Sequence, residues 1–153
     1  MSMHNWFECK IRYEKPMENG MSKKVTESYL VDSLSFTEAE AKIIKEMEPY
    51  ITGEFTVTDI KRANYSELFP CDLESADRWF KFKIMFITID EKSGVEKRTA
   101  SQMLVQASEL RDAVYRLDEG MKGTMADYEI AAVSETPIMD VYPFSADDTN
   151  NNP

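Results

Sequence analysis

Apolar and polar side chains alternate at residues 6–15 and again from residue 79 to 86. Successive side chains of a strand point to opposite faces, so both runs predict strands with one buried face. The apolar positions are Phe7, Cys9, Ile11 and Tyr13 in the first run, and Phe80, Phe82, Ile84 and Phe86 in the second.

Each run is followed by a turn and a second stretch of alternating residues. The turns contain Asn19-Gly20 and Ser93-Gly94, and glycine tolerates the positive φ that tight turns require. The second stretches span about 24–33 and 97–107. Each half of the chain therefore predicts an antiparallel hairpin.

A helix is predicted after each hairpin. Ser35 and Glu38 fit the S-x-x-E capping box, which satisfies free amides at a helix start. Apolar residues then recur at helical spacing, and we expect the helices to cover one face of the sheet. The residues that we expect to be buried there include Phe36 and Ile43 in the first half, and Leu110 and Leu117 in the second.

A closing strand is predicted near Phe55 and, in the second half, near Tyr128. In both strands the alternation breaks at the same place, because two apolar residues stand three positions apart instead of two. A shared break of this kind predicts a β-bulge in each strand. The residues that define it are Val57 and Ile60, and their counterparts Ile130 and Val133.

These matching elements arise from a repeat of the sequence itself. WFECKIRY at 6–13 returns as WFKFKIMF at 79–86, YLVDS at 29–33 as MLVQA at 103–107, and ELFP at 67–70 as DVYP at 140–143. The repeat predicts an α+β fold built by tandem duplication of a β-β-α-β unit, with antiparallel-rich sheets and a pseudo-two-fold axis. The predicted parts share one fold: a first unit 1–70, a linker 71–78, a second unit 79–144 and a disordered acidic tail 145–153.

The chain of 153 residues carries a formal net charge of −10, concentrated on the predicted helices, linker and ends. An acidic surface of this kind favours solubility. No apolar run approaches the roughly 20 residues of a membrane span, and the N-terminus lacks the pattern of a signal peptide. We therefore expect a cytoplasmic protein that does not enter a membrane, with Cys9 and Cys71 as reduced thiols.

Several stretches resemble a known family. They are HNWFECKIRYEK near the N-terminus, YLVDSLSFTEAEAKII in the middle, and MLVQASELRDAV with EGMKGTMADY toward the C-terminus. Together they are similar to a small uncharacterised bacterial domain-of-unknown-function family typical of the Bacteroidetes, over roughly residues 4–144. The resemblance implies a single-domain cytoplasmic protein. It supplies no catalytic residue, cofactor or substrate.

Signals for enzymatic chemistry are weak. His4 is the single histidine, and phosphate-binding glycine motifs are absent from the sequence. Asp59 with Lys61 and Arg62, at the predicted bulge, is the least ordinary cluster, and a surface ion pair explains it more simply than a catalytic site. We therefore predict a protein that is not an enzyme, without catalytic residues, cofactor or metal.

The outward faces of the first strands combine aromatic and basic residues. Such faces suit single-stranded nucleic acid, because bases stack on rings while cations follow phosphates. Burial of the tryptophans in the core or between the repeat units is the simpler interpretation, and the net charge opposes a polyanion. The candidate contact residues are Trp6, Lys10 and Arg12, and their counterparts Trp79, Lys81 and Lys83.

Met17, Met21 and Met139 stand near predicted turns, where methionine provides an adaptable contact surface. Core packing remains the commoner use of methionine. The sequence as a whole favours a binding or adaptor module that engages a protein partner, and single-stranded nucleic-acid binding is the alternative.

Overall fold

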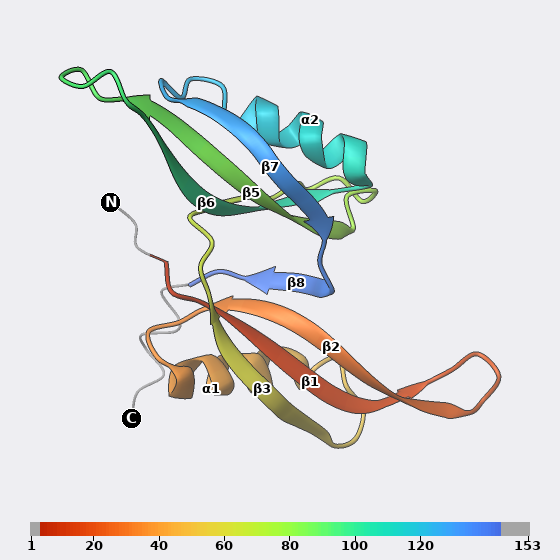
Figure 1. Ribbon diagram of the computed structural model, residues 1–153. Helices are drawn as coiled ribbons and strands as arrows, with labels where there is room; N and C mark the ends of the chain where they lie inside the picture. The colour runs from red at the N-terminus through yellow and green to blue at the C-terminus, as the bar shows by residue number, and fades with distance from the viewer. Residues whose placement is uncertain (1–3, 145–153) are drawn as a thin grey trace. The chain divides into compact units, whose positions relative to one another are not determined.

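Two long antiparallel hairpins form the centre of two sheets in the computed structural model, which describes residues 4–144 (Figure 1). The first hairpin joins β1 (Trp6–Pro16) to β2 (Ser22–Asp32), and the second joins β5 (Arg78–Ile89) to β6 (Glu96–Ala107). Their turns contain Gly20 at φ 84° and Gly94 at φ 71°. The left-handed backbone at these two positions explains why both turns use glycine.

A third antiparallel strand joins each hairpin on the side of its first strand. β3 (Phe55–Ala63) pairs with β1, and β7 (Asp127–Glu135) pairs with β5. The register shifts opposite Lys10 in the first sheet and opposite Lys83 in the second, so Thr58 and Ala131 are the extra residues. The two bulges predicted from the broken alternation are confirmed.

Each sheet takes its fourth strand from the other half of the chain. β4 (Glu67–Phe69) follows β3 in sequence and pairs in parallel with β6, whereas β8 (Ile138–Tyr142) follows β7 and pairs in parallel with β2. The strand orders are therefore β3-β1-β2-β8 and β7-β5-β6-β4. Two compact units result, which we name unit 1 (the described residues up to Asn64 and from Pro137) and unit 2 (Tyr65–Thr136).

The predicted repeat units and the observed compact units are different divisions of the chain. The α+β class is confirmed, with two four-stranded sheets and two helices among the described residues. The repeat boundaries at 1–70, 71–78 and 79–144 stay a prediction about how the sequence arose, as do the duplication and its pseudo-two-fold axis. The predicted tail 145–153 lies outside the described residues.

Both helices begin with side chains that satisfy their first backbone amides. Ser35 Oγ accepts from Glu38 N at 3.2 Å, which confirms the first bond of the predicted capping box and Ser35 as the N-cap. Glu38 Oε2 accepts from Leu34 N at 3.3 Å, one residue before the N–H of Ser35 that the box would bind. The second helix is capped by Glu109, whose carboxylate accepts from Asp112 N at 2.7 Å. A carboxylate at a helix N-terminus is also favoured by the helix dipole.

Each unit has a core between one face of its sheet and its helix. The helices are α1 (Phe36–Met47) in unit 1 and α2 (Leu110–Gly120) in unit 2, and among the described residues neither is long and apolar enough to cross a membrane. The core cluster of unit 1 consists of Phe7, Cys9, Ile11, Val31, Ala39, Ile43 and Met47. The core cluster of unit 2 consists of Phe80, Phe82, Ile84, Met103, Val105, Ala107, Ala113, Leu117 and Met121.

The predicted burial of the helices is correct for Ile43 and Leu117, which are 0% exposed, and wrong for Phe36 and Leu110, which are each 46% exposed. Phe36 and Leu110 are the first residues of their helices. A residue in the first turn has no preceding turn of helix to cover it, so apolar spacing alone does not bury it. Phe36 instead makes one edge-on ring contact with Phe7, at 4.9 Å between centroids.

We predict that Ile43→Ala lowers the free energy of unfolding by about 2–5 kcal/mol, because it removes methyl groups from a fully enclosed site. Leu34→Ala is the matched control, since Leu34 is 62% exposed and should change stability by no more than about 0.5 kcal/mol. Urea denaturation of both variants checks the assignment. Equal losses in the two variants would show that α1 does not pack as described.

Candidate functional site

The predicted contact faces keep three of their four cations exposed, but both tryptophan rings are buried. Trp6 is 5% exposed and Trp79 is 3% exposed, so neither ring offers a surface on which a base can stack. The burial agrees with the simpler interpretation drawn from the sequence. Of the four cations predicted as contact residues, Lys10 is half-buried, and Arg12, Lys81 and Lys83 are exposed. Contact of these residues with a partner or a nucleic acid stays a prediction.

His4 has a structural role at the start of β1. Its ring stacks on Trp6 with 5.3 Å between centroids, and its Nδ1 lies 2.5 Å from Asp32 Oδ2. Asp32 is buried, and its other oxygen accepts from the backbone N–H of Asn5 at 3.0 Å. These contacts fasten the start of β1 to the end of β2.

Lys42 is a buried cation that the sequence reasoning missed. It lies on the inner side of α1, and its Nζ donates to the carbonyl of Pro143 at 2.6 Å. The same Nζ lies 3.5 Å from the carbonyl oxygen of Asp32 and 5.9 Å from the centre of the Phe144 ring. Lys42 follows Ala39 by three residues, and this helical spacing indicates that both lie on the buried face of α1. These contacts hold Pro143 and Phe144, which follow β8, against α1 and the end of β2.

A hollow of about 400 Å³ lies between the start of α1 and the bulged part of β3. Arg62 does not pair with Asp59 there, because its guanidinium lies over the rings of Phe7 and Phe36, at 5.2 and 5.5 Å from their centres. Among the described residues Asp59 also forms no ion pair with Lys61, so the predicted surface ion pair is wrong. The residues that line the hollow are Phe36, Thr37, Glu40, Val57, Thr58, Asp59 and Ile60.

Both cysteines are free thiols. Burial raises the pKa of Cys9 to about 12, and the carboxylates of Glu8, Asp59 and Glu40 add to the shift. Cys9 therefore stays protonated at neutral pH and is a poor nucleophile. Within residues 4–144, no three histidine, cysteine or carboxylate side chains are grouped so that they could hold a metal ion.

A hydrogen-bonded group of tyrosines surrounds Glu27 on the helix side of the first sheet. Tyr13 and Tyr29 donate their hydroxyls to Glu27 Oε1, at 2.7 and 3.1 Å, and Lys15 Nζ lies 3.7 Å from Oε2. Burial, together with this carboxylate, raises the pKa of Tyr13 to about 12 and that of Tyr29 further. Burial likewise raises the pKa of Tyr142 to about 12. The group links the side chains of β1 and β2 across the first hairpin.

These raised pKa values predict a loss of stability in alkali. The folded state favours the protonated forms of Cys9, Tyr13, Tyr29 and Tyr142, so their contribution is complete below about pH 9, near the unfolded pKa of cysteine. It is lost as pH rises through 9 to 12, where the unfolded chain releases protons first. Urea denaturation at a series of pH values should show a falling free energy of unfolding, with a shallower fall in Cys9→Ala/Tyr142→Phe. A flat profile between pH 8 and 11 would contradict these burials.

Comparison with known proteins gives a family but no characterised relative. No curated protein and no solved structure matches the chain. One family model matches residues 5–144, which is most of the chain, and its description is a domain of unknown function, DUF4494. The resemblance to an uncharacterised domain family is thereby confirmed, and the chain belongs to the DUF4494 family.

Proposed function

We propose that this protein is a binding module that engages a protein partner. The observation that carries the proposal is the free end of the first hairpin. β3 pairs with β1 only as far as Tyr13, and β8 pairs with β2 only from Ser28 onward. Beyond these residues the hairpin continues as two strands alone, extending past the rest of its sheet (Figure 1). We name residues 14–24 the first ribbon.

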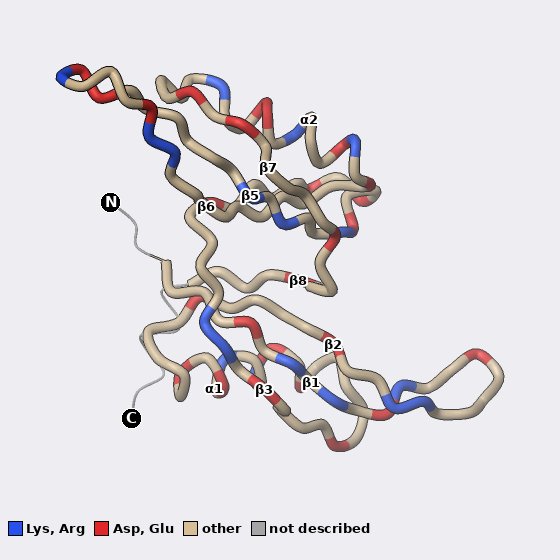
Figure 2. Tube along the Cα trace, in the orientation of Figure 1, with Lys and Arg blue, Asp and Glu red and all other residues tan. Residues whose placement is uncertain are grey.

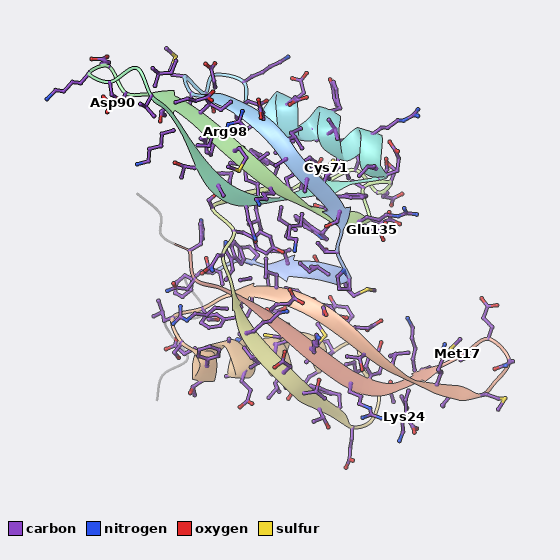
Figure 3. All side chains as sticks on the ribbon, viewed as in Figure 1. Met17, Lys24, Cys71, Asp90, Arg98 and Glu135 are labelled. Carbon is purple, nitrogen blue, oxygen red and sulfur yellow. The ribbon has the colours of Figure 1, made fainter. Side chains whose placement is uncertain are left out.

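The first ribbon presents apolar side chains between lysines. Met17 is 43% exposed and Met21 is 67% exposed, on either side of the Gly20 turn. Lys15, Lys23 and Lys24 occupy the adjoining strands, and Figure 3 labels Met17 and Lys24 there. Exposed methionines adapt their shape to apolar partners. The ribbon also carries Glu14 and Glu18, so its three lysines leave it only slightly basic, which suits a protein surface that combines apolar and acidic residues.

The second hairpin also ends in exposed apolar residues. β7 pairs with β5 only as far as Ile87, beyond which Ile89 is 68% exposed and Val95 is 61% exposed. Its turn carries Asp90 and Glu91, so this end is more acidic than the first ribbon (Figure 2). Isolated two-stranded ribbons are marginal in water, so binding is a reason for a fold to extend them. Cytoplasmic partners are consistent with two free thiols.

The test places a photoreactive benzoylphenylalanine at Met21 of the full chain and, as a control, at Met125, which is 99% exposed in unit 2. In lysate of the source cells we expect a discrete protein adduct from position 21 and none of that size from position 125. Excess unlabelled wild-type chain should suppress the adduct. Excess unlabelled Met17→Ser/Met21→Ser chain should not suppress it. Both residues are exposed, so the free energy of unfolding of this variant should stay within about 0.5 kcal/mol of the wild-type value.

Three results would contradict the proposal. One is the same adducts from both positions, and another is equal competition by the serine variant. The third is an adduct that nuclease removes, which would indicate nucleic acid as the partner.

A further inference from the structure

The two edges of the first ribbon differ in what they offer to another chain. Met17 N donates to Met21 O at 2.7 Å, and Ser33 N donates to Asn5 O at 3.1 Å, so the odd-numbered residues of β1 and β2 bond to each other. The even-numbered residues therefore point their backbone groups away from the hairpin. On β1 these include Pro16, which has no N–H to donate, so this edge cannot form a regular ladder with another strand.

The β2 edge of the ribbon carries a complete row of donors and acceptors. β8 begins opposite Ser28, so among the described residues no strand lies beside residues 22–27, which we name the open edge of β2. Ser22, Lys24 and Thr26 point their N–H and carbonyl groups outward there, and all three residues are exposed. Such a row is a template for one more strand, which would lie in line with β8 on the same side of β2.

Side chains on one face of this edge alternate between apolar and basic. Met21, Lys23 and Val25 share the face that carries Tyr13, because side chains alternate along the strand and Val25 stands opposite Tyr13. Met21 is 67% exposed, Lys23 is exposed and Val25 is half-buried. An added strand would set its own side chains next to these three, with two apolar residues on either side of the residue that meets the lysine.

The positive charge on this face has no partner of its own. Lys23 stands directly opposite Lys15 across the hairpin, and like charges in this position destabilise a strand pair. Lys15 Nζ lies 3.7 Å from Glu27 Oε2, whereas Lys23 forms no ion pair within residues 4–144. Lys24 lies on the other face and stands opposite Glu14. The uncompensated cation is therefore Lys23.

The equivalent edge of unit 2 lacks the two facing lysines. By the sequence repeat Lys97 takes the place of Lys23, and it stands opposite Thr88. The neighbouring Arg98 pairs with Glu129 at 3.2 Å, so the charge beside it is balanced within the sheet. A long hairpin of this fold therefore does not require lysines that face each other.

We propose that the open edge of β2 receives an extended segment of a partner protein as an added strand, in which an acidic residue stands beside Lys23 and between two apolar residues. The apolar residues lie against Met21 and Val25, and the backbone of the segment bonds to the outward groups of the open edge. The inference rests on the proposed function, to which it adds the mode of recognition and the chemistry of the partner segment.

The lysines oppose a second copy of this chain as the occupant. Two copies paired edge to edge along this part of β2 would bring their Lys23 and Lys24 side chains together, and like charges across a strand pair are unfavourable. Lysine on an edge strand is a common barrier to such self-association. A segment with an acidic residue meets no such barrier, so charge favours a different protein.

The test uses the full chain labelled with ¹⁵N and two blocked peptides, TVTETVT and TVTKTVT, which set a glutamate or a lysine between two valines on one face of a strand. We expect the glutamate peptide at millimolar concentration to shift the amide signals of Ser22, Lys24 and Thr26, and the lysine peptide to leave them unchanged. Methylation of the backbone nitrogens of the glutamate peptide should abolish the shifts, because it removes the donors that bond to β2.

A matched pair of variants tests the role of the lysine. Lys23→Gln should raise the apparent dissociation constant of the glutamate peptide about two- to fivefold, which is the effect of one exposed ion pair. Lys97→Gln makes the same change in net charge at the equivalent exposed position of unit 2 and should leave the constant unchanged.

The inference is overturned by no shift at the open edge with the glutamate peptide, by an equal response to both peptides, or by an unchanged constant in Lys23→Gln. Equal binding of the methylated peptide would overturn it by excluding an added strand, and shifts that grow with protein concentration alone would do so in favour of a second copy. Any of these results beside a specific adduct from position 21 leaves the proposed function in place. The photocrosslinking result bears on the proposed function alone.

Discussion

The parallel pairing of β8 with β2, and of β4 with β6, is the constraint on which the rest of the structure depends. Without these short strands the β2 edge of the first hairpin and the β6 edge of the second would be open, and open edges favour aggregation. Each strand is also fixed by contacts beside it. The ring of Tyr142 stacks on Tyr29 at 6.1 Å, and Lys42 holds the carbonyl of Pro143, while Ser66 N donates to the carbonyl of Gln102 at 2.8 Å beside β4. Because β8 pairs with β2, unit 1 is built from two separate segments of the chain, whereas unit 2 is the continuous segment Tyr65–Thr136.

Much of the fold was predictable because it depends on local patterns. Alternation located both hairpins, the Ser35–Glu38 spacing located the start of α1, and the paired breaks in alternation located both bulges. The pairing of β8 with β2, and of β4 with β6, could not be predicted, and the reason lies in the two segments themselves. ELFP and DVYP have nearly the same pattern, and each follows the same elements, so either could complete either sheet with similar local contacts.

The candidate site was only partly predictable. The bulge at Asp59 was predicted correctly, but adjacency in sequence suggested an ion pair with Lys61 and Arg62, and the guanidinium of Arg62 lies instead over two rings. The ring of Phe36 is exposed because a first-turn residue escapes burial, which helical spacing does not reveal. The basic residues near Trp6 and Trp79 were placed correctly on strands, yet the cover over both rings depends on packing that no short pattern encodes. The two units therefore share an arrangement of elements, while the two facing lysines of the first hairpin belong to unit 1.

The central claim is the exchange of fourth strands, and backbone nuclear Overhauser effects between neighbouring strands test it most directly. Equivalent residues of β2 and β6 are Leu30 and Leu104, and the structure pairs Leu30 with Val141 and Leu104 with Leu68. The account predicts inter-strand effects for these two pairs in a dilute sample. Effects between Leu30 and Leu68, and between Leu104 and Val141, would show that each half completes its own sheet and would contradict the account.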